Sequence, residues 1–186
     1  MTTLSPFPLS TAAEVVAFWR DAGPDRWFAK DDAFDQRFRT QCQALYESAA
    51  RGDLDSWAAT SEGALALVLL LDQFPRNCFR GTARMFATDA LARRLASAAI
   101  AAGHDTAVEP DLRVFFYLPF EHSEDLADQE RSVALSQPLS EEYRKYAELH
   151  RDIIRRFGRF PHRNAILGRT STPEEQQFLD DGGFAG

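Results

Sequence analysis

The sequence predicts an all-α fold, a single domain of antiparallel helix pairs with seven to nine helices over residues 1–186. Apolar residues recur at helical spacing along most of the chain, and glycines and prolines interrupt it at short intervals. No stretch alternates apolar and polar residues as a half-buried strand does. With 186 residues, of which 45% are hydrophobic and 26% charged, the chain is long enough to bury a substantial core.

The N-terminal third of the chain predicts two long helices. After a proline-containing lead-in over residues 1–9, Thr11 and Glu14 have the spacing of a capping box, and Gly23 ends the helix that they begin. A second amphipathic helix follows over residues 31–52, with an aspartate before its first turn and a glycine as its stop.

The middle of the chain predicts a buried helix and an alanine-rich helix. Ser61 is expected to cap a helix over residues 62–74 that Pro75 ends. A buried strand would also explain this apolar run, but alanine and leucine dominate it, which favours a helix. The next helix is expected over residues 82–102. Its inner face is predicted to carry Ala87, Leu91, Leu95, Ala98 and Ala102.

The C-terminal third predicts four further helices. The first covers residues 111–118 and is stopped by a proline, and Ser123 is expected to cap the next, which starts at Glu124. Ser140 caps the clearest amphipathic helix, which ends at a glycine, and Thr172 opens a short terminal helix with a second capping box.

Composition narrows the class of protein and its compartment. The net charge of −7 makes nucleic acid an unlikely partner, and the two cysteines form no pair motif, which indicates reduced thiols. The longest apolar run, residues 64–71, is far below the roughly 20 residues that span a bilayer. The first residues lack a signal-peptide pattern. We therefore expect a cytoplasmic protein without a membrane partner, and the oligomeric state is not predicted.

Two stretches share an unusual chemistry. Phe74-Pro75-Arg76-Asn77 resembles Phe160-Pro161-His162-Arg163-Asn164, and both are predicted helix breaks followed by arginine and asparagine. Because guanidinium groups match carboxylate and phosphate oxygens, the two loops predict an anion site. The candidate ligand-binding residues are Asp72, Arg76, Asn77, Arg80, Glu121, Glu124, Arg159, His162, Arg163 and Asn164.

Two histidines are candidates for general acid–base catalysis. His122 lies among three carboxylates, and His150 lies on the apolar stripe of the helix that Ser140 caps. Each could equally be a structural histidine with a hydrogen-bond partner in the core. The sequence contains no metal-ligand motif and no glycine-rich phosphate loop, so neither metal nor cofactor is expected.

Several ordered segments carry a family resemblance, the longest being LLLDQFPRNCFRG, YLPFEHSEDLADQERS and HRDIIRRFGRFPHRNAILGRTSTPEE. Over about residues 13–180 the chain resembles the uncharacterised bacterial family known as domain of unknown function 924. The resemblance implies a right-handed superhelical bundle like that of tetratricopeptide repeats, without their consensus. It implies no established activity.

Two functions remain open from the sequence. In the first, the protein binds, or acts as an enzyme on, a small anionic or phosphorylated molecule in a cavity of histidine, arginine and carboxylate groups. In the second, it is a tetratricopeptide-like module for protein–protein interaction, and the same polar residues tie helix ends together. Whether the protein is an enzyme, and which reaction it would catalyse, the sequence leaves undecided.

Overall fold

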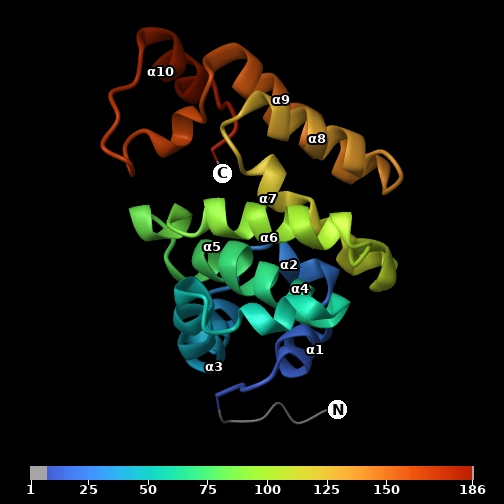
Figure 1. Ribbon diagram of the computed structural model, residues 1–186. Helices are drawn as coiled ribbons and strands as arrows, with labels where there is room; N and C mark the ends of the chain where they lie inside the picture. Colours follow the sequence, from blue (N-terminus) through green and yellow to red (C-terminus); the bar gives the residue numbers. More distant parts are fainter. Residues whose placement is uncertain (1–7, 186) are drawn as a thin grey trace. The chain divides into compact units, whose positions relative to one another are not determined.

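A computed structural model describes residues 8–185, and these fold into helices and turns without a strand (Figure 1). The all-α prediction is confirmed. The lead-in predicted for residues 1–9 lies almost entirely outside the described residues. Within residues 8–185, no helix is both long enough and apolar enough to cross a membrane.

The chain divides into two compact units. Unit 1 comprises residues 1–80 and 84–119, described from residue 8 onward, and unit 2 comprises residues 81–83 and 120–186, described to residue 185. The single domain expected over residues 1–186 stays a prediction.

Unit 1 is built mainly from five α-helices and their short connections. These are α1 (Ala12–Ala22), α3 (Asp32–Arg51), α4 (Ser61–Val68), α5 (Phe74–Cys78) and α6 (Asp89–Ala101). Unit 1 also contains the one-turn helix α2 (Pro24–Trp27), a π-helical segment at Leu69–Gln73 and 3-10 turns at Asp55–Ala59, Asp105–Ala107 and Pro110–Phe116. A further 3-10 turn, Ala83–Phe86, lies in unit 1 except for its first residue.

An aromatic cluster forms the core of unit 1. The Trp19 side chain is fully buried, and its ring lies 5.4 Å from that of Phe38 and 5.3 Å from that of Phe115. The Trp27 indole N–H donates to the Trp19 carbonyl oxygen at 2.7 Å, which fixes α2 against α1. Large aromatic rings bury much apolar surface and also prefer particular ring-to-ring orientations, so they hold these helices in one arrangement.

Local capping chemistry sets most helix ends as predicted. The capping box of Thr11 and Glu14 is present at α1, and Gly52 ends α3 in the left-handed conformation, with φ of 85°. The predicted cap Ser61 is wrong by one residue, because the Thr60 hydroxyl accepts the hydrogen bond from the Gly63 N–H.

Pro75 does not end the central helix, and this prediction is wrong. Residues Leu69–Gln73 form a π-helical segment that joins α4 to α5 without a break. A proline inside a helix leaves the carbonyl four residues earlier without its partner, here that of Leu71. The Thr88 hydroxyl donates to this carbonyl oxygen at 2.6 Å. The helix therefore passes through the proline because a side chain from the start of α6 replaces the missing bond.

The helix expected over residues 82–102 begins later, at Asp89, and buries a different face from the predicted one. The buried residues of α6 are Ala92, Ala96 and Ala99, while Ala98 is exposed. Asp89 accepts two hydrogen bonds from the Arg76 guanidinium, at 2.9 and 3.0 Å. This contact with α5 positions the first turn of α6, and local sequence could not reveal it.

In unit 2 the main helices are α8 (Leu126–Ser136), α9 (Glu141–Phe157) and α10 (Pro173–Asp180), and the one-turn helix α7 (Leu118–Glu121) spans the boundary between the units. A short turn joins α8 to α9, and the two helices pack against each other. Ser140 caps α9 and Thr172 forms a capping box at α10, as predicted. The predicted cap Ser123 is wrong, because the Asp125 carboxylate accepts from the Ala127 and Asp128 N–H groups.

We predict that Thr88→Val destabilises the protein by about 1–3 kcal/mol, because the buried Leu71 carbonyl loses its donor. Thr88→Ser keeps the hydroxyl and should retain most of the stability. Urea denaturation followed by circular dichroism measures both. Equal stability of the valine and serine variants would contradict this role for the hydroxyl.

Candidate functional site

The candidate residues from the sequence fall into two sets, one in each unit. Asp72, Arg76, Asn77 and Arg80 belong to unit 1. The residues in unit 2 are Glu121, His122, Glu124, His150, Arg159, His162, Arg163 and Asn164.

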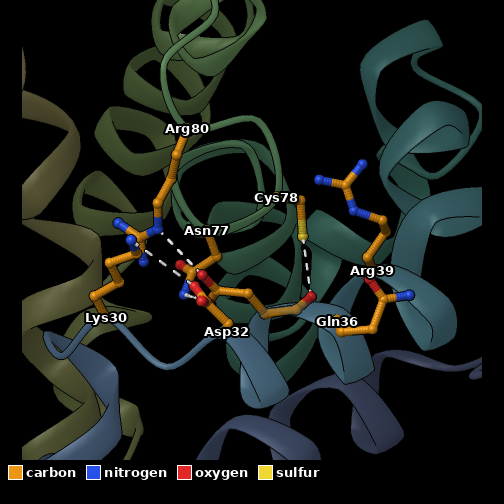
Figure 2. A pocket seen from close by; sticks show the side chains of 8 residues that line it. Lys30, Asp32, Gln36, Arg39, Asn77, Cys78 and Arg80 are labelled. Carbon is orange, nitrogen blue, oxygen red and sulfur yellow. Dashed lines mark hydrogen bonds and ion pairs between the residues drawn. The ribbon is translucent and has the colours of Figure 1, made fainter.

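An open hollow of about 300 Å³ lies on unit 1, and we call it the unit 1 hollow. It is lined by Lys30, Asp32, Asp35, Gln36, Arg39, Asn77, Cys78 and Arg80. In the view of Figure 2, Lys30 and Arg80 stand at one end and Arg39 at the other, with Cys78 between them. Helix α3 and the C-terminal end of α5 supply most of these side chains.

Asp35 connects the two walls of the unit 1 hollow. Its carboxylate accepts from the Asn77 amide at 2.7 Å and from Arg80 Nε at 3.1 Å, and the residue is 8% exposed. The sequence prediction missed Asp35, because its position near the start of α3 indicates only a favourable interaction with the helix dipole. Asn77 and Arg80, which were predicted, are brought together here.

Arg39 is the arginine of the hollow that sequence reasoning overlooked. It is half-buried, and its guanidinium lies 5.4 Å from the centroid of the Phe79 ring. Within residues 8–185 it has no carboxylate partner. Stacking on an aromatic face orients a guanidinium without neutralising its charge, so the donors of Arg39 stay available at the edge of the hollow.

Arg76 and Asp72 do not line this hollow. Arg76 contacts the fully buried Asp72 at 3.1 Å and is bound twice by Asp89. Burial alone would lower the pKa of the Arg76 guanidinium, but the two carboxylates outweigh it and raise that pKa. Gln73 also donates to Asp72, at 2.6 Å. These predicted ligand residues form an internal ion network.

Cys78 lines the hollow but is not an activated thiol. Burial raises the pKa of its thiol to about 12. The nearby Asp35 charge also raises this pKa, whereas Arg39 and Arg80 lower it. Since the thiolate is the reactive form, the thiol of Cys78 stays protonated at neutral pH. Covalent catalysis by this cysteine is therefore not supported.

In unit 2 the predicted histidines gather around two phenylalanine rings. The imidazoles of His150 and His162 lie 5.5 and 5.6 Å from the Phe160 ring, and 4.5 and 5.3 Å from the Phe184 ring. We call this set, with Glu121 and His122, the histidine cluster. Phe184 was not predicted, since a phenylalanine near two glycines gives no signal of its position.

Hydrogen bonds fix the imidazole of His150. Its Nδ1 lies 2.8 Å from the Tyr146 carbonyl oxygen and 3.3 Å from Glu121 Oε1. Because a carbonyl can only accept, Nδ1 carries the proton, and in the neutral ring Nε2 is the acceptor. This orientation by a carbonyl and a carboxylate is also the arrangement that a general base requires.

His150 and His162 are neutral at physiological pH. Burial lowers the pKa of His150 to about 3, and His122 and Arg163 lower it further. The hydrogen bond to Tyr146 acts in the opposite direction but is outweighed. Burial and Arg163 lower the pKa of His162 to about 4. His122 also lowers the pKa of both rings. Such weak bases act at pH 7 as hydrogen-bonding groups and not as proton acceptors.

The other predicted polar residues of unit 2 are bound by neighbouring groups of the protein. Glu124 accepts twice from Arg169, at 2.7 and 2.9 Å, and once from the Phe160 N–H at 2.8 Å. These bonds outweigh the effect of burial and lower the pKa of Glu124. The loop after α9 is thereby tied to the start of α8.

A second network ties the same loop to α10. Glu175, whose side chain is 3% exposed, accepts from Arg159 Nε at 2.5 Å and from Arg159 Nη2 at 2.7 Å. It also accepts from the Thr172 N–H at 2.7 Å and the Asn164 amide at 3.3 Å. Arg163 lies 4.4 Å from the centroid of the Phe160 ring. Arg159 and Asn164 are thus engaged inside unit 2.

A metal site is not supported in the described part of the chain. Among residues 8–185, no three histidine, cysteine or acidic side chains are placed to hold an ion. The two cysteines are buried and free.

We predict that Glu175→Gln lowers stability at pH 7 by about 1–3 kcal/mol, because the charge-assisted bonds to Arg159 are lost. The hydrogen bonds from Arg159 hold the pKa of Glu175 at about 2, below its ordinary 4.5. Its stabilising contribution is therefore complete above about pH 4.5 and disappears as the pH falls toward 2.

Urea midpoints of the wild type and of Glu175→Gln at pH 7 and pH 3 test this. The difference between them should be smaller at pH 3. The matched control is Glu174→Gln, which changes a carboxylate whose side chain is 63% exposed. A difference that is constant with pH would show that the carboxylate charge of Glu175 does not stabilise the fold.

Comparisons with known proteins agree with the resemblance seen in the motifs. Residues 15–183 match the family described as a bacterial protein of unknown function, DUF924. The structure is similar to that of a protein of unknown function from Agrobacterium tumefaciens, with 60% identity and a TM-score of 0.91. The similarity covers 92% of this chain and 97% of that one. No curated protein matches the chain.

Proposed function

The chain belongs to the bacterial family of unknown function DUF924, and we propose that this protein binds a small anionic molecule, carrying a phosphate or a carboxylate, in the unit 1 hollow. The observation that carries the proposal is Arg39, a half-buried guanidinium at the hollow without a carboxylate partner in residues 8–185. An anion that enters the hollow would supply the missing partner.

The charge balance of the hollow supports an anion. Its lining contains three cations and two carboxylates. Asp35 is already engaged by Asn77 and Arg80, so its charge is largely neutralised. The Lys30 side chain is 72% exposed, and its ammonium lies as far as 4.0 Å from the carboxylate of the exposed Asp32. An exposed ion pair at this distance is weak. Positive charge is therefore in excess where a ligand would lie.

The size of the hollow limits the ligand. About 300 Å³ is at the lower end of the range of ligand pockets, about 300–1,000 Å³. The hollow is open to solvent and its walls are polar, which suits a small metabolite and not a large apolar one. Arginine forks at the rim would hold a planar carboxylate or a phosphate through paired hydrogen bonds.

This proposal narrows the site expected from the sequence. Of the ten candidate ligand residues, Asn77 and Arg80 line the hollow, and the arginines of the ion networks are occupied by acidic side chains. No reaction is proposed, because the Cys78 thiol is protonated. The alternative, a tetratricopeptide-like interaction module, predicts no response to small anions, so one titration separates the two.

We predict that inorganic phosphate or malonate at millimolar concentration raises the melting temperature of the protein, because a ligand bound only by the folded state stabilises it. Arg39→Gln should weaken the binding of the effective anion by about tenfold, as expected when a charged hydrogen bond is lost. Isothermal titration calorimetry at low salt measures the affinity.

The matched control is Arg37→Gln. Arg37 lies on the same helix, also stacks on a phenylalanine ring, at 5.9 Å, and does not line the hollow. The Arg37→Gln variant should bind the anion as the wild type does, and added salt should weaken binding to the variant and to the wild type. No response to either anion, or equal losses in the two variants, would refute the proposal.

A further inference from the structure

We propose that the ring of Phe184 occupies a second ligand site, in unit 2, and that this site takes a small aromatic molecule bearing a hydrogen-bond donor. The site is the histidine cluster. It is independent of the unit 1 hollow, which is lined by other residues and suits an anion.

The cluster forms a box for a flat ring. The Phe184 ring meets the imidazoles of His150 and His162 edge to face, at interplanar angles of 66° and 77°. It also packs against the buried apolar group of Ile153, Ile154 and Phe160. Edge-to-face contact with two rings and an apolar backing is the environment that aromatic ligands prefer.

The polar atoms of this box are not used by the phenylalanine. His162 Nδ1 is buried and has no hydrogen-bond partner in residues 8–185. In His150, the bond from Nδ1 to the Tyr146 carbonyl leaves Nε2 as an acceptor. A hydrocarbon ring offers neither imidazole a hydrogen bond. A ligand ring with an O–H or N–H group can offer one, and the gain is largest at the buried His162 Nδ1, where an unmade hydrogen bond is costly.

Phe184 is held in a way that permits its release. It follows Gly182, whose φ is 80°, and Gly183, whose N–H donates to the Phe178 carbonyl oxygen at 2.9 Å. Phe184 is only partly buried, and no backbone hydrogen bond of its own is found in the described chain. The ring therefore competes for the box as a tethered side chain, and a ligand that displaces it breaks few other contacts.

Gly183 provides a way to move the ring without removing it. A Cβ at Gly183 would lie 2.5 Å from the Phe178 carbonyl oxygen, closer than Cβ contacts in folded proteins. Gly183→Ala must therefore shift the segment that carries Phe184. Two variants can thus empty the box by different means.

The test is a titration of the full chain with phenol and, in parallel, with benzene, which has the same ring and no donor. The resonances of the His150 and His162 ring protons in NMR spectra report binding. We expect Phe184→Ala and Gly183→Ala to bind phenol about tenfold more tightly than the wild type, because the competing ring is absent or displaced. Benzene should bind more weakly than phenol to every form.

The control is Phe28→Ala, which removes an exposed phenylalanine of unit 1 and should leave phenol binding unchanged. If Phe184→Ala does not fold, Gly183→Ala still decides the matter. The proposal is overturned if neither variant binds phenol more tightly, or if benzene binds as well as phenol. Failure here leaves anion binding at the unit 1 hollow untouched, since that titration uses different probes and variants.

Discussion

The pairing of partly buried arginines with carboxylates is the constraint on which the structure depends. A guanidinium cannot be removed from water without a partner, because the cost of its desolvation exceeds what packing returns. Arg76 therefore joins α5 to the start of α6 through Asp89, and Arg159 joins the end of α9 to α10 through Glu175. Arg169 joins the loop between α9 and α10 to the start of α8 through Glu124. The positions of these helix ends follow from charge neutralisation as much as from apolar burial.

The same constraint supports the proposed anion site at the unit 1 hollow. Where an arginine is neutralised by the protein itself, a ligand anion would have to compete with a carboxylate held in place at high effective concentration. Arg39 stacks on Phe79 and faces no such competitor in the described residues. The histidine cluster differs again, because burial keeps His150 and His162 neutral, so it offers hydrogen bonds and ring faces and no positive charge. The two proposed sites thus differ in chemistry, the unit 1 hollow suiting an anion and the histidine cluster suiting an aromatic ring.

Local rules accounted for the helix starts that local bonds determine. Thr11, Ser140 and Thr172 cap their helices as their spacing predicts. The errors arise where a distant residue decides: the central helix continues through Pro75 because Thr88 satisfies the Leu71 carbonyl. The sequence predicts both Phe-Pro motifs as helix breaks, but Pro75 lies within a helix, and Pro161 begins a 3-10 turn after Gly158 has ended α9. Asp35, Arg39 and Phe184 carry no sequence signal, since only tertiary packing brings them to the two sites.

The most direct measurement of the central claim is an NMR titration of the arginine Nε–H groups with inorganic phosphate. The claim is that ion pairs occupy the partly buried Arg76 and Arg169 and leave Arg39 available. The Nε–H resonance of Arg39 should shift progressively with phosphate, while those of Arg76 and Arg169 stay in place. Movement of the Arg76 or Arg169 resonance with an unchanged Arg39 resonance would contradict the account.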